Sequence, residues 1–195
     1  MGCARSGALL VLLIGTGPMA TKAEPTESVQ AIDLTRSGAH FAVHMRIRMK
    51  AEGRMSAAGG ELRGSPGAGW RVLMKVDGRS LRFDGPGWMD RITRSDAFLA
   101  VGRYPAIRFR SDPFADAVLH AGGSLHGQLT LRGLTRPVSF QMLPSSCARI
   151  GRDCDIQVQG TISRHAFGMN AHRALVKDDV DFHMRVRLQA ETATP

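Results

Sequence analysis

The stretch Leu125-His-Gly-Gln-Leu-Thr-Leu-Arg-Gly-Leu-Thr-Arg-Pro-Val-Ser-Phe-Gln-Met142 decides the fold of this protein. In its first half, apolar or small residues alternate with polar ones, as in a β-strand with one buried face. Residues 133–137 interrupt the pattern, and the alternation then resumes up to Met142. The stretch therefore predicts two antiparallel strands joined by a short turn, with an apolar face that another part of the chain must cover.

The same alternation recurs along most of the chain. It predicts further strands at residues 39–50, 53–62, 70–76, 107–109, 117–120, 156–162 and 180–188. Between residues 88 and 101 the apolar spacing instead predicts one or two short helices, the second with Ser95 or Asp96 as its N-cap. Residues 163–179 are expected to form a long connection that is too polar for the core.

About eight antiparallel strands, each with one apolar face, fit either two packed sheets or a closed barrel. We favour an all-β antiparallel barrel, because closure removes the exposed edges of the long first and last strands. A barrel of about eight strands encloses just enough space for its own side chains or for one small ligand. The strand pattern alone does not distinguish a filled lumen from an open one.

The start of the chain has the features of a secretory signal peptide. Residues 1–23 contain Arg5, an apolar run and small residues before a cleavage point at Glu24. The apolar run is shorter than the roughly 20 residues that a spanning helix needs. We therefore expect one mature domain over residues 24–195, exported to the periplasm.

Cleavage would remove Arg5 and Lys22 and lower the formal net charge from +9 to +7. In an exported protein, such an excess of positive charge favours anionic lipid head groups or phosphorylated ligands over nucleic acid as partners. A solvated basic surface without a partner explains the charge equally well. Two basic sets would face outward and approach an anionic membrane surface: Arg46, Arg48 and Lys50, and Arg185 and Arg187.

Cys147 and Cys154 are the only cysteines left after this cleavage. In an oxidising compartment they predict a structural disulfide, which would stabilise the fold by roughly 2–3 kcal/mol. A metal site would need two further ligands close by in the sequence. The spacing is too wide for a thioredoxin-like redox pair.

Five segments resemble the YceI-like family of exported lipid-binding proteins. They are Leu-Thr-Leu-Arg-Gly-Leu-Thr-Arg-Pro-Val at 129–138, Asp90 with Arg-Ser-Asp-Ala-Phe at 94–98, Tyr-Pro-Ala-Ile-Arg-Phe-Arg-Ser at 104–111, Gly-Thr-Ile-Ser-Arg-His-Ala-Phe-Gly-Met at 160–169, and Asp-Asp-Val at 178–180. The resemblance runs from about residue 29 to residue 189. The family's Ser-Asp pair before Phe-Gly is His165-Ala166 here, a departure that bears on the preferred head group.

The resemblance implies a lipocalin-like barrel whose apolar lumen holds an isoprenoid chain, such as a quinone tail or a polyprenyl phosphate. The residues with lumen parity are Phe41, Val43, Met45, Ile47, Trp70, Val72, Met74, Phe109, Leu129, Leu131, Phe140, Met142, Phe182 and Met184. The same residues are what any filled barrel contains. Candidate head-group ligands at strand ends or in turns are Arg103, Arg132, Arg136 and Arg164, because arginine pairs its hydrogen bonds well with phosphate.

Nothing in the sequence matches a catalytic motif. There is no nucleophile elbow, no His-Glu-x-x-His and no glycine-rich phosphate loop before a helix. The seven histidines are not spaced as metal ligands, so we expect neither a metal nor a cofactor. We therefore expect a non-enzymatic carrier or store of isoprenoid lipid. The alternatives are an enzyme of lipid or quinone metabolism that uses the same cavity, and a filled barrel that acts as an envelope interaction module.

Overall fold

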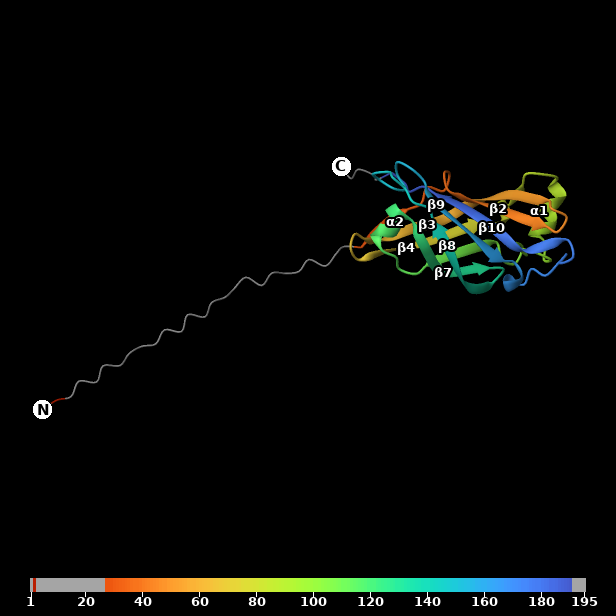
Figure 1. Cartoon of the computed structure of the whole chain (residues 1–195). Coiled ribbons are helices and arrows are strands. Elements are labelled where there is room, and N and C mark those ends of the chain that lie inside the picture. The colour runs from red at the N-terminus through yellow and green to blue at the C-terminus, as the bar shows by residue number, and fades with distance from the viewer. Residues whose placement is uncertain (1, 3–26, 191–195) are drawn as a thin grey trace.

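The computed structural model describes Gly2 and residues 27–190, and the predicted signal peptide lies outside this part of the chain except for Gly2. The strands are β1 Ser28–Ala31, β2 Gly38–Met45, β3 Lys50–Ser65, β4 Gly69–Asp77, β5 Arg82–Phe83, β6 Ala106–Ser111, β7 Gly123–Leu131, β8 Leu134–Met142, β9 Ile156–Ser163 and β10 Val176–Val186. The helices are α1 Gly87–Arg94 and α2 Asp116–Ala121, with short 3-10 turns at Gly78–Ser80 and His165–Phe167. Helices α1 and α2 lie at opposite ends of the strands (Figure 1). No helix of the described residues is long and apolar enough to cross a membrane.

The strands close into a barrel. The hydrogen-bonded order is β3-β2-β10-β9-β8-β7-β6-β4, and β4 pairs back onto β3, with every pairing antiparallel. The 16 residues of β3 make this closure possible. The first half of β3 lies between β2 and β5, and its second half lies between β1 and β4. The predicted all-β antiparallel barrel is confirmed.

The strand predicted over residues 39–50 is divided by a tight turn. Strand β2 ends at Met45, β3 begins at Lys50, and the Met45 backbone N–H donates to the Met49 carbonyl at 2.8 Å. Arg48 has φ of 61°, a left-handed conformation that residues other than glycine rarely adopt. The turn contains no Gly, Pro or Asn, and Ile47 and Met49 continue the strand alternation through it. The prediction of one long strand is therefore wrong.

The helix predicted near residues 88–101 is present, whereas a strand predicted at residues 117–120 is helical. Helix α1 confirms a helix near residues 88–101, but residues 95–99 form a bend and turns instead of a second helix. The hydroxyl of Ser95 donates to the Ile92 carbonyl at 2.6 Å, so Ser95 ends α1 and does not begin a new helix. The strand predicted at residues 117–120 is helix α2, which starts at Asp116. Four residues are too few to distinguish the two-residue period of a strand from the roughly 3.6-residue period of a helix.

The connection after β9 contributes to the core, contrary to the prediction from its polarity. Phe167 and Met169 belong to the apolar core, and Arg164 is only 2% exposed. Glycine at Gly168 has φ of 74°, which turns the chain back toward β10. The last strand begins at Val176, earlier than the predicted residue 180.

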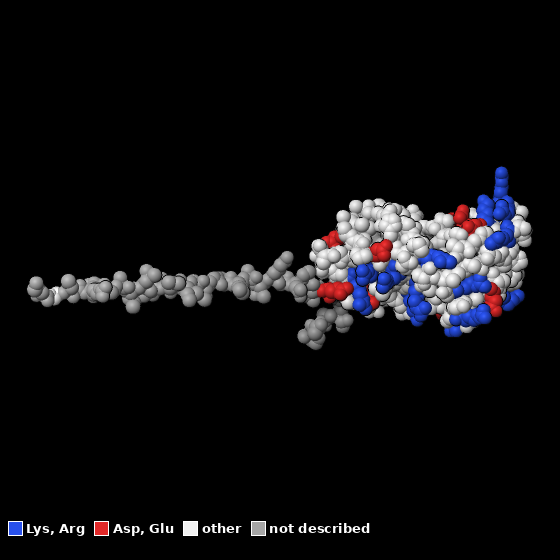
Figure 2. All heavy atoms as spheres, turned by 90° about the horizontal axis from the view of Figure 1, so that it is seen from below, with Lys and Arg blue, Asp and Glu red and all other residues white. Residues whose placement is uncertain are grey.

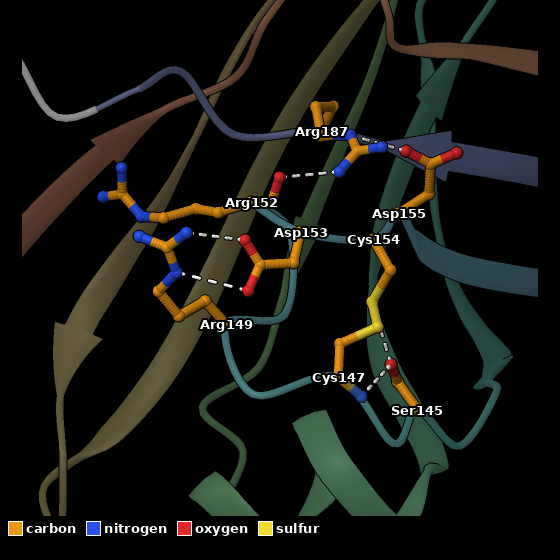
Figure 3. The surroundings of a disulfide bond; sticks show 8 residues. All are labelled: Ser145, Cys147, Arg149, Arg152, Asp153, Cys154, Asp155 and Arg187. Atoms are coloured by element: carbon orange, nitrogen blue, oxygen red, sulfur yellow. Dashed lines mark hydrogen bonds and ion pairs between the residues drawn. A yellow bond between two sulfur atoms is a disulfide. The ribbon is translucent and has the colours of Figure 1, made fainter.

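The predicted disulfide is present at the end of the barrel that carries α2. Cys147 and Cys154 are bonded within the loop between β8 and β9, with their Cα atoms 6.3 Å apart (Figure 3). The same loop is tied to the end of β10, because Arg187 forms an ion pair with Asp155 at 2.8 Å. Helix α2 joins it through the Ser145 backbone N–H, which donates to the His120 carbonyl at 2.9 Å.

Candidate ligand cavity

An apolar cavity of about 340 Å³ occupies the half of the barrel next to α1. We call this part of the lumen the hollow half. Its walls come from β2, β3, β5, β6, β7, β9 and β10, and its lid comes from α1, the residues that follow α1, and the loop after β9. Among the lining residues, Thr93, Arg164 and His172 are the polar ones. The volume lies at the lower end of the roughly 300–1,000 Å³ that is usual for small-molecule sites.

Aromatic rings form much of the cavity wall. Phe41 packs edge-on against Phe83, with ring centroids 5.2 Å apart, and lies 6.4 Å from Phe182. The ring of Phe41 lies against β3 at Gly53, where a Cβ atom would come within 2.5 Å of the ring and 2.7 Å of the Arg82 carbonyl oxygen. Glycine at this position therefore lets the ring lie along the wall and leaves the lumen open beside it.

The half of the lumen next to α2 and the disulfide is packed by its own side chains. We call it the filled half. The void among these side chains has a volume of about 20 Å³. Met74, Met142 and Met184 converge on this void from β4, β8 and β10. Flexible thioether side chains fill irregular gaps well, so this packing closes the bottom of the cavity.

The open end of the cavity, here called the mouth, is bordered by α1 and the loop after β9. Trp88 and Ile92 of α1 line the cavity and remain half-exposed. On the opposite side, His172 stacks on Phe98 with ring centroids 5.8 Å apart. Leu175 also lines the cavity and is exposed. The mouth therefore has an apolar rim that continues the apolar interior.

The match to a protein-family model covers residues 30–188 and is described as a YceI-like domain. The chain belongs to the YceI-like family. This YceI-like chain shares its fold with BcnA of Burkholderia cenocepacia, at a TM-score of 0.62 and 20% identity over 82% of this chain and 99% of that one. A polyisoprenoid binding domain from Saccharophagus degradans, implicated in plant cell wall breakdown, matches at a TM-score of 0.59 and 14% identity, over 86% of this chain and 99% of that one. A search of the curated proteins found no significant match.

The residues predicted to line the lumen of this YceI-like barrel divide into four groups. Those that line the cavity are Phe41, Val43, Met45, Leu129, Leu131 and Phe182. Those that border the small void of the filled half are Val72, Met74, Phe109, Met142 and Met184. Trp70 is buried beside α2, where its indole N–H donates to Asp116, and Phe140 packs edge-on against Phe109 at 5.2 Å. Ile47 lies outside the lumen, because the β2–β3 turn leaves it 62% exposed.

Arg164, a predicted head-group ligand, is built into the wall. Its guanidinium donates to the carbonyls of Lys177, Met169, Ala171 and Val176 at 2.6–3.1 Å and lies 5.9 Å from the centre of the Phe98 ring. Burial lowers the pKa of Arg164, and the Asp178 carboxylate opposes that shift. Because the guanidinium already binds four carbonyls, its first role is to hold the loop that covers the cavity.

Two other predicted head-group arginines also bind this loop. Arg132 sits in the β7–β8 turn with φ of 53° and donates to the carbonyls of Gly168 and Asp96. Arg136 donates to the Ala166 carbonyl at 3.4 Å. Arg103 lies exposed in the turns between α1 and β6. The structure thus brings three of the four arginines to one loop, where their donors meet backbone carbonyls.

Two carboxylates of β10, those of Asp178 and Asp181, are not among the residues that line the cavity. The pKa of Asp178 is lowered: burial, the largest influence, favours the neutral form, but hydrogen bonds from Ser163 and the His165 backbone N–H, with the nearby cations, outweigh it. The pKa of Asp181 is lowered chiefly by its contact with His44 at 2.7 Å and by the hydroxyl of Thr161. Within the described residues no three His, Cys, Asp or Glu side chains form a metal site.

Sequence reasoning missed the lid of the cavity. Trp88, Met89 and Ile92 of α1 line it, and so do His172 and Leu175 of the long loop. The helical spacing of Trp88 and Ile92 was a usable signal, because an apolar stripe on a short crossover helix must cover something. A wider hollow of about 690 Å³ on the outer face of β2, β10 and β9 is open and polar, so it does not compete as a site for an apolar ligand.

Proposed function

We propose that this protein holds the isoprenoid tail of a lipid, such as a polyprenyl phosphate or a quinone, in the hollow half of its barrel. It carries or stores that lipid without chemical turnover. The observation that carries the proposal is one apolar cavity that is closed at the filled half and bordered at its mouth by apolar side chains. A flexible hydrocarbon chain gains free energy there by leaving water. The polar head group would remain outside the mouth.

The family supports this ligand class. The Saccharophagus degradans domain of the same fold is described as polyisoprenoid binding. The proposed compartment is the bacterial periplasm. It rests on the signal-peptide features of residues 1–23 and on the Cys147–Cys154 disulfide, which persists in oxidising compartments.

The test is mass spectrometry of lipid extracted from natively purified protein. An isoprenoid lipid should be recovered in near-stoichiometric amount, and lipid-free protein should take up an added polyprenyl phosphate or quinone. Protein that is consistently empty and also refuses both added lipids would overturn the proposal.

A cavity-filling variant ties the ligand to the hollow half. Ala51 lines the cavity, so Ala51→Phe places a ring inside it and should lower lipid recovery strongly. Ala42 is the matched control, because it lies on the neighbouring strand and borders the open outer hollow. Ala42→Phe should retain the lipid. Equal recovery from both variants would place the ligand elsewhere.

An enzyme that uses the same cavity is the competing function, and the same lipid preparations test it. Such an enzyme would convert the bound lipid, and the product would be lost in His165→Ala. His165 is not among the residues that line the cavity, and its ring contacts Asp178 at 3.1 Å. We therefore expect unchanged lipid after prolonged incubation, and a product that depends on His165 would favour the enzyme.

A further inference from the structure

Exposed apolar side chains concentrate around the mouth of the cavity. Among the described residues, nine large apolar side chains are exposed. Three of them lie on α1 and the loop after β9, which border the mouth, and two lie on the adjoining β2–β3 turn, which is hydrogen-bonded to that loop. We call these five the mouth patch: Ile47, Met49, Trp88, Ile92 and Leu175. Trp88 and Leu175 are 51% and 55% exposed, whereas Trp70, the other tryptophan, is buried beside α2 at the far end.

The elements that carry the mouth patch are joined to one another. The Arg46 backbone N–H of the β2–β3 turn donates to the Leu175 carbonyl at 2.8 Å, and the Arg46 side chain donates to the Arg173 carbonyl at 3.1 Å. Helix α1 is held against the start of β3 through β5, which pairs with Gly53. Three members of the patch also line the cavity, so the patch and the interior form one continuous apolar surface.

Basic side chains are interleaved with the mouth patch. Arg46 and Arg48 flank Ile47 in the turn, Arg91 lies between Trp88 and Ile92 in the sequence of α1, and Arg173 precedes Leu175. All four arginines are exposed. Figure 2 shows several Lys and Arg side chains at the right-hand end of the molecule, the end that carries α1 in Figure 1, and others along the rest of this face. The second predicted basic set is at the opposite end, where Arg187 is paired with Asp155.

We propose that the mouth patch docks the barrel, mouth down, on a bilayer that contains anionic lipid. Apolar side chains entering the interface next to arginines at head-group level are the arrangement by which peripheral proteins bind such membranes. Tryptophan favours this interface, because its ring is apolar and its N–H is polar. Docking rests on the proposed function in one respect: it brings the mouth to the surface from which a lipid would enter the cavity.

The binding test is flotation of the purified protein with vesicles. Phosphatidylcholine vesicles that contain about one-third phosphatidylglycerol should carry the protein, and pure phosphatidylcholine vesicles should carry much less. Raising NaCl from about 0.1 M to about 0.5 M should release most of it, because salt screens exposed charges. Trp88 fluorescence should shift to the blue on binding and should be quenched by brominated lipid, because Trp88 is the exposed tryptophan.

Matched variants separate docking from lipid loading. Ile47 and Met49 are not among the residues that line the cavity, so Ile47→Ser/Met49→Ser should weaken vesicle binding about ten-fold and leave lipid recovery unchanged. The control is Val29→Ser/Leu34→Ser, which removes two exposed apolar side chains outside the mouth. Arg48→Glu should weaken binding by a further about ten-fold or more, since each cation near the surface contributes about five-fold. Arg71→Glu, on the exposed side of β4, should not.

The outcomes distinguish this proposal from the proposed function. Protein that contains isoprenoid lipid but ignores anionic vesicles overturns docking and leaves the function standing. Protein that floats with the vesicles but never holds a lipid leaves docking standing and overturns the function. If Ile47→Ser/Met49→Ser changes the oligomeric state in solution and not vesicle binding, the mouth patch is a protein interface and docking is wrong.

Discussion

The two halves of the barrel lumen share strands β3, β6, β7, β9 and β10, yet one half is hollow and the other is filled. In the filled half, Met74, Phe109 and Met142 meet across the lumen and leave a void of about 20 Å³. In the hollow half, Phe41, Phe182 and their neighbours line the walls and leave about 340 Å³. The alternation of side chains is the same in both. The two halves therefore differ in which side chains from opposite strands pack against one another across the lumen. The pattern of one strand does not determine this packing.

The two ends are also closed differently. At the filled end, a disulfide and the Arg187–Asp155 ion pair hold the β8–β9 loop, and α2 lies at the same end. The hollow end is covered by α1 and by a loop that Arg164 holds through backbone carbonyls. A cover of this kind can line a cavity without filling it. Substitutions in the filled half should therefore lower the unfolding free energy without changing lipid binding.

The largest expected effect follows from removing Arg164. Arg164→Leu leaves the carbonyls of Met169, Ala171 and Val176 without their donor in a buried place, which should cost about 3–5 kcal/mol of unfolding free energy. Urea denaturation measures the loss. Arg103→Leu, at an exposed position, should change stability by less than about 0.5 kcal/mol. A loss below about 1 kcal/mol for Arg164→Leu would mean that the cover of the hollow half does not depend on it.

Truncation of the same residue type in each half tests the comparison directly. Met142 is 1% exposed in the filled half, so Met142→Ala should cost about 3 kcal/mol, whereas Met45→Ala only enlarges an existing cavity and should cost less than about 1.5 kcal/mol. Lipid recovery should be retained in Met142→Ala and reduced in Met45→Ala. Equal stability losses would show that the two halves are equally packed in solution.

The architecture was predictable because alternation has a direct physical cause. In β7, β8 and the last strand β10, many side chains at every second position are apolar and face the core, and this alternation made these strands predictable. Closure followed from the need to remove strand edges. The β2–β3 turn was hidden because Ile47 and Met49 keep the strand pattern while Arg48 adopts a left-handed conformation.

The site was predictable only in part. Lumen parity identified Phe41, Leu129 and Phe182, which do line the cavity, but it applied equally to Met74 and Met142, which fill the other half. The lid was not predictable from strand parity, because it is made by a helix and a loop. The four arginines were predicted as head-group ligands at strand ends or in turns. The burial of Arg164 depends on carbonyls of the residues that follow it, a contact that a strand pattern does not encode.

A smaller effect is expected from the disulfide, and only at the filled end. Replacing both cysteines, Cys147→Ser/Cys154→Ser, should lower the unfolding free energy by about 2–3 kcal/mol, because the open loop has more conformational entropy in the unfolded chain. The cavity is at the other end, so lipid recovery should stay the same. Loss of lipid in this variant would show that the two ends are coupled.

The smallest expected effect is a pH dependence of the unfolding free energy that arises from Asp181, on the strand β10 beside the hollow half. The pKa of Asp181 is lowered in the folded protein by His44 and Thr161, so its stabilising contribution is complete above the ordinary carboxyl pKa near 3.9 and is lost as the pH falls through the lower folded value. The pair is partly exposed, so the contribution should be below about 1 kcal/mol.

Denaturation midpoints between about pH 5 and pH 2 measure this contribution. The wild-type protein should lose stability on acidification more steeply than Asp181→Asn, whose amide cannot titrate. Glu27→Gln is a control, because Glu27 precedes the barrel strands and is exposed. Hydrogen exchange should locate the acid-induced loosening in β10 beside β2 and not near the disulfide. Loosening at the disulfide end first would show that the Asp181 contact is not where acid acts.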